Sequence, residues 1–330
     1  MTVLVTGGAG FIGSHMVLEL LDAGEDVVVL DNLSTGFRWA VPDAAEFVEG
    51  DVGDRDLLRR LSLRYPIQSI IHFAGSIVVP ESIVHPLGYY LNNTCKSRTL
   101  IATAVEAKVP HFIFSSTAAV YGVPEINPVT EEARLLPISP YGSSKLMTES
   151  MLRDTAVATD LRYVALRYFN VAGADPKGRS GQSTPRATHL IKVASEAVLG
   201  QRPYLEMFGT DYPTEDGTCI RDYIHVSDLT RAHLDALRYL RAGGASEVLN
   251  CGYGRGFSVR EVVSSVKRVS GSDFAVREGP RRPGDPAALV AGPARIEKVL
   301  GWKPRLDDLD TIVGHALAWE KRLTDFRAAS

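Results

Sequence analysis

The stretch Val3-Leu4-Val5-Thr6-Gly7-Gly8-Ala9-Gly10-Phe11-Ile12-Gly13 decides the fold of this chain. An apolar strand at 3–6 leads directly into glycines at 7, 10 and 13, and a helix pattern follows over 11–23. Glycine permits a tight turn, lets the backbone approach a diphosphate, and allows a helix to pack closely on a strand. The start of the helix adds free N–H groups and a partial positive charge. The stretch therefore predicts a dinucleotide site, although its GxxGxxG spacing is wider than GxGxxG.

The rest of the first half alternates short apolar runs with longer amphipathic stretches. Further strands are predicted at 26–30, 46–48, 69–73, 111–115 and 162–168, and helices at 54–65, 87–107 and 140–158. Strands that are apolar on both faces and separated by helices indicate a parallel sheet covered on both sides. The predicted fold class is therefore α/β, a doubly wound parallel sheet of the Rossmann type.

After about residue 172 the composition changes. Residues 173–185 are rich in Gly, Pro, Ser and charge, and a helix at 190–200, an acidic loop at 211–217 and short strand and helix patterns follow. We predict a NAD-binding domain over 1–172 and a smaller C-terminal α/β substrate-binding domain over 173–330, partly interleaved with the sheet. The length of 330 residues fits two associated domains.

Composition excludes several classes of protein. With 45% hydrophobic and 23% charged residues the chain resembles a soluble globular protein. Its net charge of −3 argues against a general nucleic-acid binder, and the basic cluster at 59–64 is predicted to be a solvated helix face. No apolar run approaches the roughly 20 residues that span a bilayer, so no membrane partner is expected.

The cysteines and acidic residues give no sign of a disulfide framework or a metal site. Cys95, Cys219 and Cys251 are far apart and lack CxxC spacing, which fits a reducing compartment. The acidic loop at 211–217 does not have EF-hand spacing, so we predict no metal. The N-terminus lacks a signal-peptide pattern because glycines interrupt it, and we expect a cytoplasmic protein.

An acidic residue closes the second predicted strand at the distance that a dinucleotide site requires. Asp31 lies 18 residues after Gly13, where a carboxylate can hold a ribose hydroxyl. Asn32 and Leu33 follow, without an arginine for a 2′-phosphate, so NAD is favoured over NADP. Asp51 and Val52, after the third strand, are predicted beside the adenine; a turn or helix cap is an equal alternative for Asp51.

Of the twelve tyrosines, only Tyr141 has a lysine four residues later, Lys145. Ser139 can cap the helix that carries both, and residues four apart share a helix face. A free tyrosine, with a pKa of about 10, is a poor base near neutrality, and a nearby cation lowers such a pKa by about 1–3 units. By itself, however, a Tyr-xxx-Lys pattern is usually a surface pair.

The strand before this helix changes that weighting. It ends in Ser115-Ser116-Thr117, which places hydroxyls at the carboxyl end of the sheet, where ligands bind in open α/β folds. Thr117 could hydrogen-bond a reacting hydroxyl; its alternative is to cap a loop. Together with the glycines, these residues predict hydride transfer with Tyr141 and Lys145 as the catalytic pair.

These residues resemble the extended short-chain dehydrogenase/reductase family, and within it the nucleotide-sugar 4-epimerases. The resemblance runs from Val3 to about Trp302, and Ala118-Ala119 follow Thr117 where related dehydratases tend to carry an acidic pair. Its more specific stretches are His72-Phe73-Ala74-Gly75, Tyr89-Tyr90 with Asn92-Asn93, Phe112–Gly122, Tyr141–Lys145, Arg167-Tyr168-Phe169-Asn170, Phe208–Gly217 and Arg221–His225.

The resemblance implies a 4-epimerisation of a UDP-sugar through a 4-keto intermediate, with UDP-glucose/UDP-galactose as the first pair to test. Tyr141 would remove the 4-hydroxyl proton while hydride passes to tightly held NAD. Lys145 would orient the nicotinamide ribose and lower the tyrosine pKa, and Thr117 would assist. The hydride would then return to the other face of the sugar, so no net oxidation occurs.

The residues argued above and those that the resemblance implies give two predicted contact sets. The cofactor set is Gly7, Gly10, Phe11, Ile12, Gly13, Asp31, Asn32, Asp51, Val52, Phe73, Ala74, Gly75, Asn92, Ser115, Tyr141, Lys145 and Tyr168. The substrate set is Thr117, Tyr141, Asn170, His189, Leu190, Phe208, Arg221, Arg282, Asp285 and Leu289. By resemblance Asn170, Arg221, Arg282 and Asp285 hold the UDP portion, with both arginines on the diphosphate, for which guanidinium donors are suited. A satisfied loop histidine is an equal alternative for His189.

Two positions depart from the family pattern. Ile77 stands where relatives often have a lysine after Phe-Ala-Gly, which removes a contact to cofactor or substrate and bears on NAD retention. Leu289 stands where some members carry a bulky tyrosine. Because leucine is smaller and apolar, we hypothesise that 2-acetamido sugars are accepted.

Several alternatives remain open. The enzyme could epimerise another UDP-sugar, such as an N-acetylhexosamine, a pentose or a uronate, or act as a net NAD-dependent dehydrogenase. A non-catalytic NAD-sensing protein would be expected to lose the Tyr/Lys pair, which this chain keeps. A homodimer through the helices at 87–107 and 140–158 is implied by relatives; the alanine-rich face at 101–107 suits helix packing or an ordinary core.

Overall fold

A large parallel sheet organises the computed structural model, which describes residues 1–185, 187–282 and 285–328. Its seven strands follow the order β10-β6-β5-β4-β1-β2-β3, and every neighbouring pair is parallel. The strands are β1 (Thr2–Thr6), β2 (Asp26–Asp31), β3 (Glu46–Glu49), β4 (Ile67–His72), β5 (His111–Thr117), β6 (Arg162–Tyr168) and β10 (Glu247–Cys251). The predicted doubly wound α/β class is confirmed.

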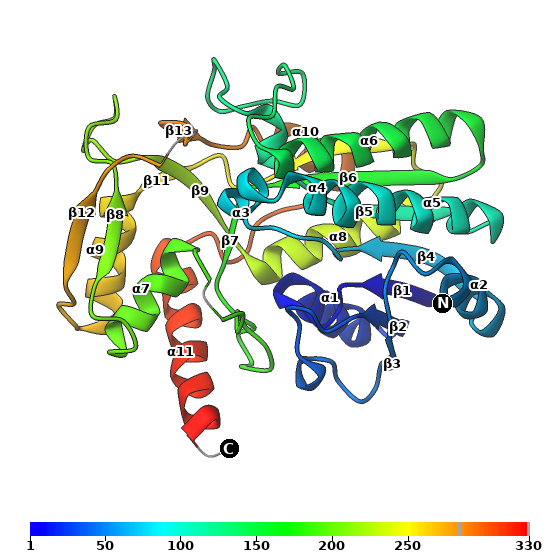
Figure 1. The fold of residues 1–330 in the computed structure, drawn as a ribbon, viewed down its shortest axis with the longest axis horizontal. Helices are drawn as coiled ribbons and strands as arrows, with labels where there is room; N and C mark the ends of the chain where they lie inside the picture. Colours follow the sequence, from blue (N-terminus) through cyan, green and yellow to red (C-terminus); the bar gives the residue numbers. More distant parts are fainter. Residues whose placement is uncertain (186, 283–284, 329–330) are drawn as a thin grey trace.

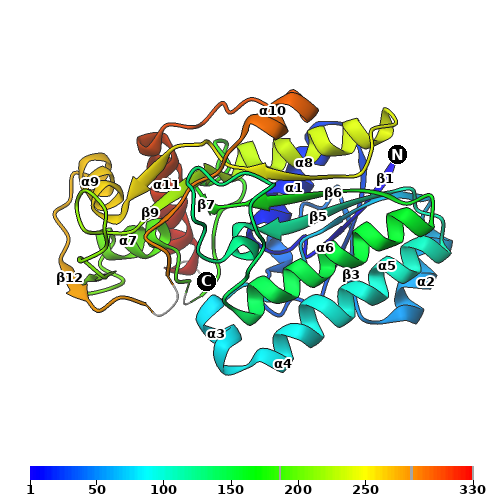
Figure 2. The same ribbon diagram turned by 90° about the horizontal axis from the view of Figure 1, so that it is seen from above.

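Helices cover both faces of this sheet (Figure 1). On one face lie α1 (Phe11–Asp22) and α8 (Val226–Arg241), and on the other lie α2 (Arg55–Arg64), α5 (Lys96–Glu106) and α6 (Pro140–Ala158). Successive strand residues point to opposite faces, so Val3 and Val5 pack with α1 while Leu4 packs with the other layer. Figure 2 shows α5 and α6 running side by side over the sheet. Burial on both faces explains why these strands are continuous apolar runs.

The predicted helix over 87–107 differs in its backbone. It is divided into α4 (Pro86–Tyr89), a π-helical segment η2 (Tyr90–Cys95) and α5, and a short helix α3 (Val79–Val84) precedes it. In η2 the Asn93 side chain accepts from the Ser76 N–H and donates to the Ser76 carbonyl. π-helical turns are rare and are often found beside functional sites. Here the wider turn brings η2 against the loop that follows β4.

The second half of the chain forms a smaller layer and also returns to the large sheet. A mixed sheet has the order β11-β9-β13 with β7 also on β9, and β8 pairs with β12. The elements of this layer are β7 (Asn170–Ala172), α7 (Leu190–Val198), β8 (Leu205–Phe208), β9 (Ile220–His225), β11 (Gly256–Ser258), α9 (Val259–Ser270), β12 (Val276–Gly279), β13 (Ala288–Leu289) and α11 (Leu309–Ala328). Helix α10 (Ala294–Leu300) packs instead on β10 and α8 of the large sheet. Short 3₁₀ turns lie at η1 (Arg38–Ala40) and η3 (Ala118–Tyr121). The second half also contributes α8 and β10 to the large sheet and its covering layer. The predicted boundary after residue 172 therefore divides the chain into two ranges that both contribute to the large sheet.

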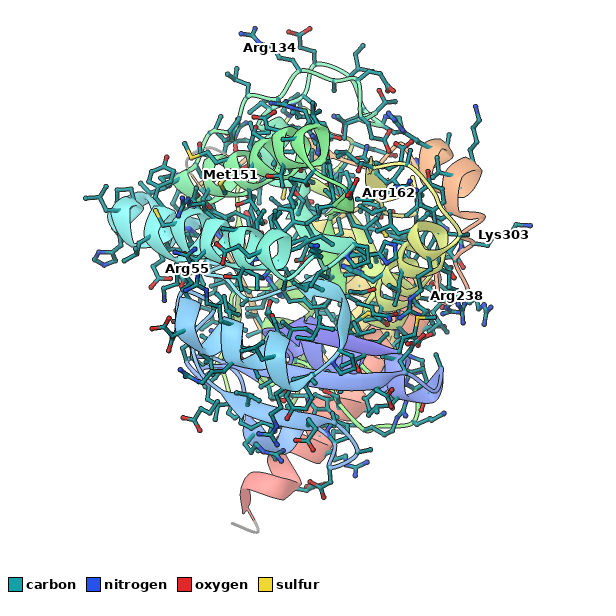
Figure 3. All side chains as sticks on the ribbon, turned by 90° about the vertical axis from the view of Figure 1, so that its right-hand side faces the viewer. Arg55, Arg134, Met151, Arg162, Arg238 and Lys303 are labelled. Atoms are coloured by element: carbon teal, nitrogen blue, oxygen red, sulfur yellow. The ribbon has the colours of Figure 1, made fainter. Side chains whose placement is uncertain are left out.

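The basic cluster of α2 lies on the outside of the molecule. Arg55 and Arg59 both bind Glu106 of α5, and Figure 3 shows Arg55 on this face, at a distance from the labelled Arg238 and Lys303. Arg55 and Arg59 thus share one acidic partner on the neighbouring helix. Across the described ranges, no helix is both long and apolar enough to cross a membrane.

Candidate active site

A cavity of about 720 Å³ lies at the carboxyl ends of the large sheet. Its walls come from the loops after β1, β2, β4 and β5, from the start of α6, and from β7, α7, β9, β13 and α11 of the second half. Ligands of open α/β folds bind at this edge because the connecting loops meet there. The cavity brings most of the residues predicted for cofactor and substrate into one continuous space.

The glycine-rich turn forms a backbone cradle in this cavity. Gly7 has a φ of +73°, and a Cβ at this position would lie 2.5 Å from the Ala74 nitrogen. A Cβ on Gly13 would lie 2.0 Å from the Gly7 oxygen, so neither position accepts a larger residue. Gly10 is the N-cap of α1 and supplies no side-chain cap, which leaves the first-turn N–H groups to face the cavity. Such a cradle fits the diphosphate of a dinucleotide.

The acidic residue after β2 is held in a fixed position. The Asp31 carboxylate accepts hydrogen bonds from the Ala9 N–H (2.9 Å) and the Leu33 N–H (2.8 Å) and lines the cavity. With its orientation set by two backbone donors, it can still accept from a ribose hydroxyl. Ser34 and Thr35 also line this end, and the sequence argument did not single them out.

Asp51 combines the two roles that the sequence left open. Its carboxylate accepts from the Gly53 N–H (2.7 Å), as a turn residue does, and forms an ion pair with Lys96 (2.5 Å). Asn32 donates to it at 3.2 Å, and Asp51, Val52 and Asn32 all line the cavity. The contact of this group with an adenine stays a prediction.

Tyr141 and Lys145, the predicted catalytic pair, lie at the start of α6, which begins as the sequence predicts. Ser139 accepts from the Gly142 N–H (3.2 Å), and Pro140 is the first helical residue. Tyr141 and Thr117 line the cavity, whereas Lys145 lies one turn deeper and donates to the Ser115 carbonyl (2.9 Å). The Thr117 hydroxyl accepts from the Ala119 N–H (3.1 Å), so it also makes the capping bond that was the alternative.

Burial dominates the electrostatics of Tyr141 and Lys145 in the protein alone. Burial raises the pKa of Tyr141, and its interaction with the Thr117 hydroxyl opposes this only in part. Burial also lowers the pKa of Lys145 to about 8, with Glu149 acting in the opposite direction. The Lys145 ammonium is directed to the Ser115 carbonyl, and the lowering of the Tyr141 pKa by Lys145 stays a prediction for the enzyme with NAD bound.

The wall between the cradle and Tyr141 combines apolar residues with polar residues that are hydrogen-bonded within the protein. It contains Phe73, Ala74, Gly75, Asn92, Ser115 and Tyr168, as expected. The hydroxyls of Ser115 and Tyr168 bind each other, and the Asn92 amide donates to the Ser76 hydroxyl (2.9 Å). Ile77 lines the mouth of the cavity with 53% of its surface exposed. The position where relatives often have a lysine is therefore apolar and open.

The opposite wall is formed by the second half of the chain. Asn170, Leu190, Arg221, Asp285 and Leu289 line it, and Arg221 forms an ion pair with Asp285. Pairing of β9 with β13 places Leu289 beside Arg221 in register. A charged group and an apolar group thus stand next to each other on this wall, a pattern suited to a ligand with an anionic and a less polar end.

His189 shows both of the features that the sequence left open. Its Nδ1 lies 2.8 Å from the Gln182 side-chain nitrogen, so the ring is satisfied within the loop, and it also lines the cavity. The choice between a ligand contact and a loop histidine therefore stays open.

Phe208 and Arg282 are not brought to the cavity wall. The Arg282 guanidinium lies over the Phe208 ring at 4.0 Å from its centroid, and neither residue lines the cavity. A guanidinium on an aromatic face is a favourable pair in its own right. The contact of Arg282 with a diphosphate stays a prediction.

The C-terminal helix α11 contributes residues that sequence reasoning missed. Trp319 and Glu320 line the cavity with Tyr223 and Lys192, and Lys192 forms a buried ion pair with Glu320. Residues 192 and 320 lie far apart in the sequence, so no local spacing signals that they meet. Among the described residues, no group of three or more His, Cys, Asp or Glu side chains could hold a metal ion.

Comparison with known proteins agrees with this geometry. The family model described as "NAD dependent epimerase/dehydratase family" matches residues 3–252. The chain is 60% identical over 321 residues to the "UDP-glucose 4-epimerase" of Azospirillum brasilense, covering 97% of this chain and 92% of that protein.

Two solved structures are similar over nearly the whole chain. The UDP-glucose 4-epimerase of Brucella ovis in complex with NAD has a TM-score of 0.93 at 47% identity and covers 96% of this chain and 97% of its own. The UDP-Glc/GlcNAc 4-epimerase of Campylobacter jejuni has a TM-score of 0.86 at 48% identity, with 97% and 99% covered. Since the family match and these relatives span most of the sequence, the chain belongs to the NAD-dependent epimerase/dehydratase family.

Proposed function

We propose that this protein is a NAD-dependent UDP-sugar 4-epimerase whose first substrate pair is UDP-glucose and UDP-galactose. One observation carries the proposal: a single cavity joins the Gly7–Gly13 cradle, the Tyr141 and Thr117 hydroxyls, and the Arg221–Asp285 pair. Dinucleotide, reacting group and anionic substrate end can therefore meet in one space. The similarity to named 4-epimerases supports the same reaction.

The residues of the cofactor wall suit NAD. The glycine cradle offers backbone N–H groups to a diphosphate, and the fixed Asp31 carboxylate offers an acceptor to a ribose hydroxyl. Asn32 and Leu33, and not an arginine that could receive a 2′-phosphate, directly follow Asp31. When bound, NAD supplies a hydride acceptor that takes hydrogen from the sugar 4-carbon and gives it back on the opposite face.

Tyr141 is the group placed to move the hydroxyl proton. It lies at the cavity surface with Thr117 beside it, so a sugar 4-hydroxyl there can donate to the phenolate while Thr117 holds its orientation. Burial raises the Tyr141 pKa, and each unit by which that pKa must fall requires about 1.4 kcal/mol of differential stabilisation. Lys145, one turn away, is the cation of this chain that can supply part of it once its ammonium turns toward the site.

The two ends of the substrate side explain how one site can serve both faces of a sugar. Arg221 provides guanidinium donors for a diphosphate, while Ile77, Ile138 and Leu289 add apolar surface to the same cavity. Charge-assisted hydrogen bonds hold the nucleotide end strongly, and apolar contacts are not directional. A keto sugar held mainly by its nucleotide can then turn over before hydride returns.

Two features of the site bear on the reaction and on the substrate: the alanines after Thr117 argue against dehydration, and the space beside Leu289 suits a sugar with a 2-acetamido group. Ala118 and Ala119 line the cavity after Thr117, and an alanine cannot exchange a proton as the acidic pair of dehydratases would. Leu289 leaves room where some relatives have tyrosine, so a 2-acetamido sugar is a second candidate substrate. The similarity to an epimerase named for both UDP-Glc and UDP-GlcNAc supports this choice.

We further propose a cytoplasmic homodimer that pairs through α4, α5 and α6. The exposed apolar side chains of this region include Leu87 in α4, Leu91 in η2 and Met147 in α6. Ile101 and Ala104 are buried in the core and are therefore not available for a dimer contact. For these two residues of the 101–107 face, the alternative of an ordinary core position applies. Sedimentation that finds only monomer at micromolar concentration would refute the dimer.

The test uses purified protein with no added NAD and a panel of UDP-sugars, analysed for 4-epimers. Formation of UDP-galactose from UDP-glucose without added cofactor is the expected result, and conversion of no sugar overturns the proposal. Tyr141→Phe separates an enzyme from an NAD-sensing protein, because it removes the proton-accepting oxygen but leaves the cradle intact. We expect at least a 100-fold loss of turnover, in line with the contribution of a positioned acid–base group, with NAD content unchanged.

A further inference from the structure

Helix α6 carries a third functional side chain on the face of the catalytic pair. Glu149 follows Lys145 by four residues, as Lys145 follows Tyr141, so the three share one helix face. Glu149 is only 5% exposed and does not line the cavity. A buried carboxylate needs partners, because desolvation of an unpaired charge is costly.

The partners of Glu149 come from two strands of the sheet. Arg167 of β6 donates to both of its oxygens, from Nε to Oε1 (3.0 Å) and from Nη2 to Oε2 (2.6 Å). The Ser116 hydroxyl of β5 donates to Oε1 at 2.5 Å. Arg167 in turn donates to the Tyr121 hydroxyl (3.0 Å), which donates to Asn250 of β10 (2.6 Å). Glu149 therefore ties the catalytic helix to the ends of β5, β6 and β10.

The bond to Ser116 fixes the strand end that holds the reacting groups. Side chains alternate along a strand, and here Ser115 and Thr117 face the cavity while Ser116 faces α6. Ser115 accepts the Lys145 ammonium through its carbonyl, and Thr117 interacts with Tyr141. By holding the middle residue, Glu149 sets the position of both neighbours relative to α6.

Glu149 also determines the electrostatic surroundings of Lys145. The other groups near the ammonium are His72 of β4 and the Phe114 ring, and Tyr141 lies one helical turn away on α6. Burial lowers the pKa of His72 to about 3, so its ring is neutral and adds no positive charge beside the ammonium. Glu149 is the carboxylate that favours the charged form of Lys145, while Arg167, bound to Glu149, reduces this effect.

We propose that Glu149, held by Arg167 and Ser116, is a positioning residue that keeps Lys145 protonated and the Ser115–Thr117 strand end aligned with Tyr141. The role rests on the proposed epimerase function, because it requires Lys145 to act as a cation. Neither Glu149 nor Arg167 contacts substrate in this role. Its signature is a change in the pH dependence of turnover.

The sign of the effect follows from the charges. Glu149→Gln removes a negative charge and leaves Arg167 unbalanced, so Lys145 loses its proton at lower pH. The alkaline limb of the kcat–pH profile, where turnover falls as pH rises, then moves to lower pH by about 1 pH unit or more. Arg167→Met removes the positive partner of Glu149, so the unpaired carboxylate favours the charged form of Lys145 more strongly. The alkaline limb then moves to higher pH. The double variant removes both charges, so no unpaired arginine remains near Lys145. Its alkaline limb still moves to lower pH, because Glu149 is the carboxylate that favours the charged form of Lys145, but by less than in Glu149→Gln.

Glu25→Gln is a matched control for the loss of a two-pronged carboxylate–arginine pair. Glu25 binds Arg241 through both oxygens, as Glu149 binds Arg167, and does not line the cavity. This variant should lower thermal stability without moving the alkaline limb. A general structural effect would act alike in both carboxylate variants.

The experiment measures kcat and KM from pH 6 to 10 on holoprotein of matched NAD content. A Glu149→Gln enzyme with the wild-type limb overturns the proposal, as does a shift of Arg167→Met in the same direction. If either single variant does not fold, the double variant is used as the test, because it leaves no unpaired buried charge. A double variant with the wild-type alkaline limb and the wild-type kcat overturns the proposal. Wild-type protein that forms no 4-epimer refutes the proposed function instead.

Discussion

The two walls of the cavity recognise their ligands by different means. The cofactor wall is a run of consecutive residues, Gly7–Gly13, whose backbone forms the cradle, with one carboxylate fixed by backbone donors. The substrate wall consists of side chains from β7, α7, β9, β13 and α11, and on it Arg221 of β9 forms an ion pair with Asp285. A wall of backbone has no tolerance for added atoms, whereas a wall of side chains can be changed one group at a time. The cofactor is thus expected to be constant and the sugar adjustable.

Gly13→Ala should have the largest effect, because the new Cβ would lie 2.0 Å from the Gly7 oxygen within the backbone of the cradle. The turn must move, and with it the N–H groups that face the diphosphate. We expect purified protein to carry no NAD and to convert no sugar unless NAD is supplied in large excess. Cofactor released by denaturation and measured by its absorbance gives the occupancy.

Gly88→Ala is the matched control, since a Cβ there meets nothing within 4 Å and the residue lies in helix α4. It should keep full NAD content. Normal NAD occupancy in Gly13→Ala would show that the cradle tolerates added atoms and would remove the contrast between the walls.

Arg221→Ala should have an intermediate effect that is confined to the substrate wall. The guanidinium is nearly buried and is paired with Asp285, so its loss removes charged donors and leaves a carboxylate beside the diphosphate. A hydrogen bond to a charged group is worth about 1.5–3 kcal/mol, which corresponds to a roughly 10–150-fold weaker UDP affinity. Titration calorimetry with UDP measures it, with NAD content unchanged.

The control for Arg221 is Arg268→Ala, which breaks a pair with Asp310 on the surface away from the cavity. Exposed pairs contribute little, so UDP affinity should stay within about twofold. Equal UDP affinity in Arg221→Ala and wild type would mean that the nucleotide binds elsewhere in the cavity.

Leu289→Tyr should have the smallest effect, a change of preference rather than of activity. The larger ring fills space beside Arg221, so the rate ratio of UDP-N-acetylglucosamine to UDP-glucose should fall by about tenfold, as one misfitting group in a pocket does. Competing-substrate assays give the ratio directly. Leu289→Met, of similar volume, should keep it, and an unchanged ratio in Leu289→Tyr rejects the hypothesis of 2-acetamido tolerance.

The cofactor half of the site was the more predictable from sequence. Glycines 7, 10 and 13, Asp31, and the Tyr141–Lys145 pair are local patterns, and each lies where the strand–helix order places it. The substrate half depended on resemblance, because Asn170, Arg221 and Asp285 have no spacing that links them. Arg282, predicted on the diphosphate, lies over Phe208 in the structure.

The misses have a common physical cause. Trp319, Glu320 and Lys192 reach the cavity only because α11 packs against α7, a contact between segments more than a hundred residues apart. The pKa of Tyr141 depends on burial and on where the Lys145 ammonium points, and neither follows from a four-residue spacing.

The sequence by itself determined the parallel sheet, the glycine cradle, the preference for NAD and the placement of Tyr141 and Lys145 on one helix face, because each rests on backbone conformation or helix periodicity within a short stretch. Tertiary structure alone decided that β10 and α8 return to the first sheet, that α11 closes the cavity, and that Glu149 and Arg167 meet beneath Lys145. These features arise from long-range packing of apolar surface and from the pairing that buried charges require, and both depend on the whole chain being folded.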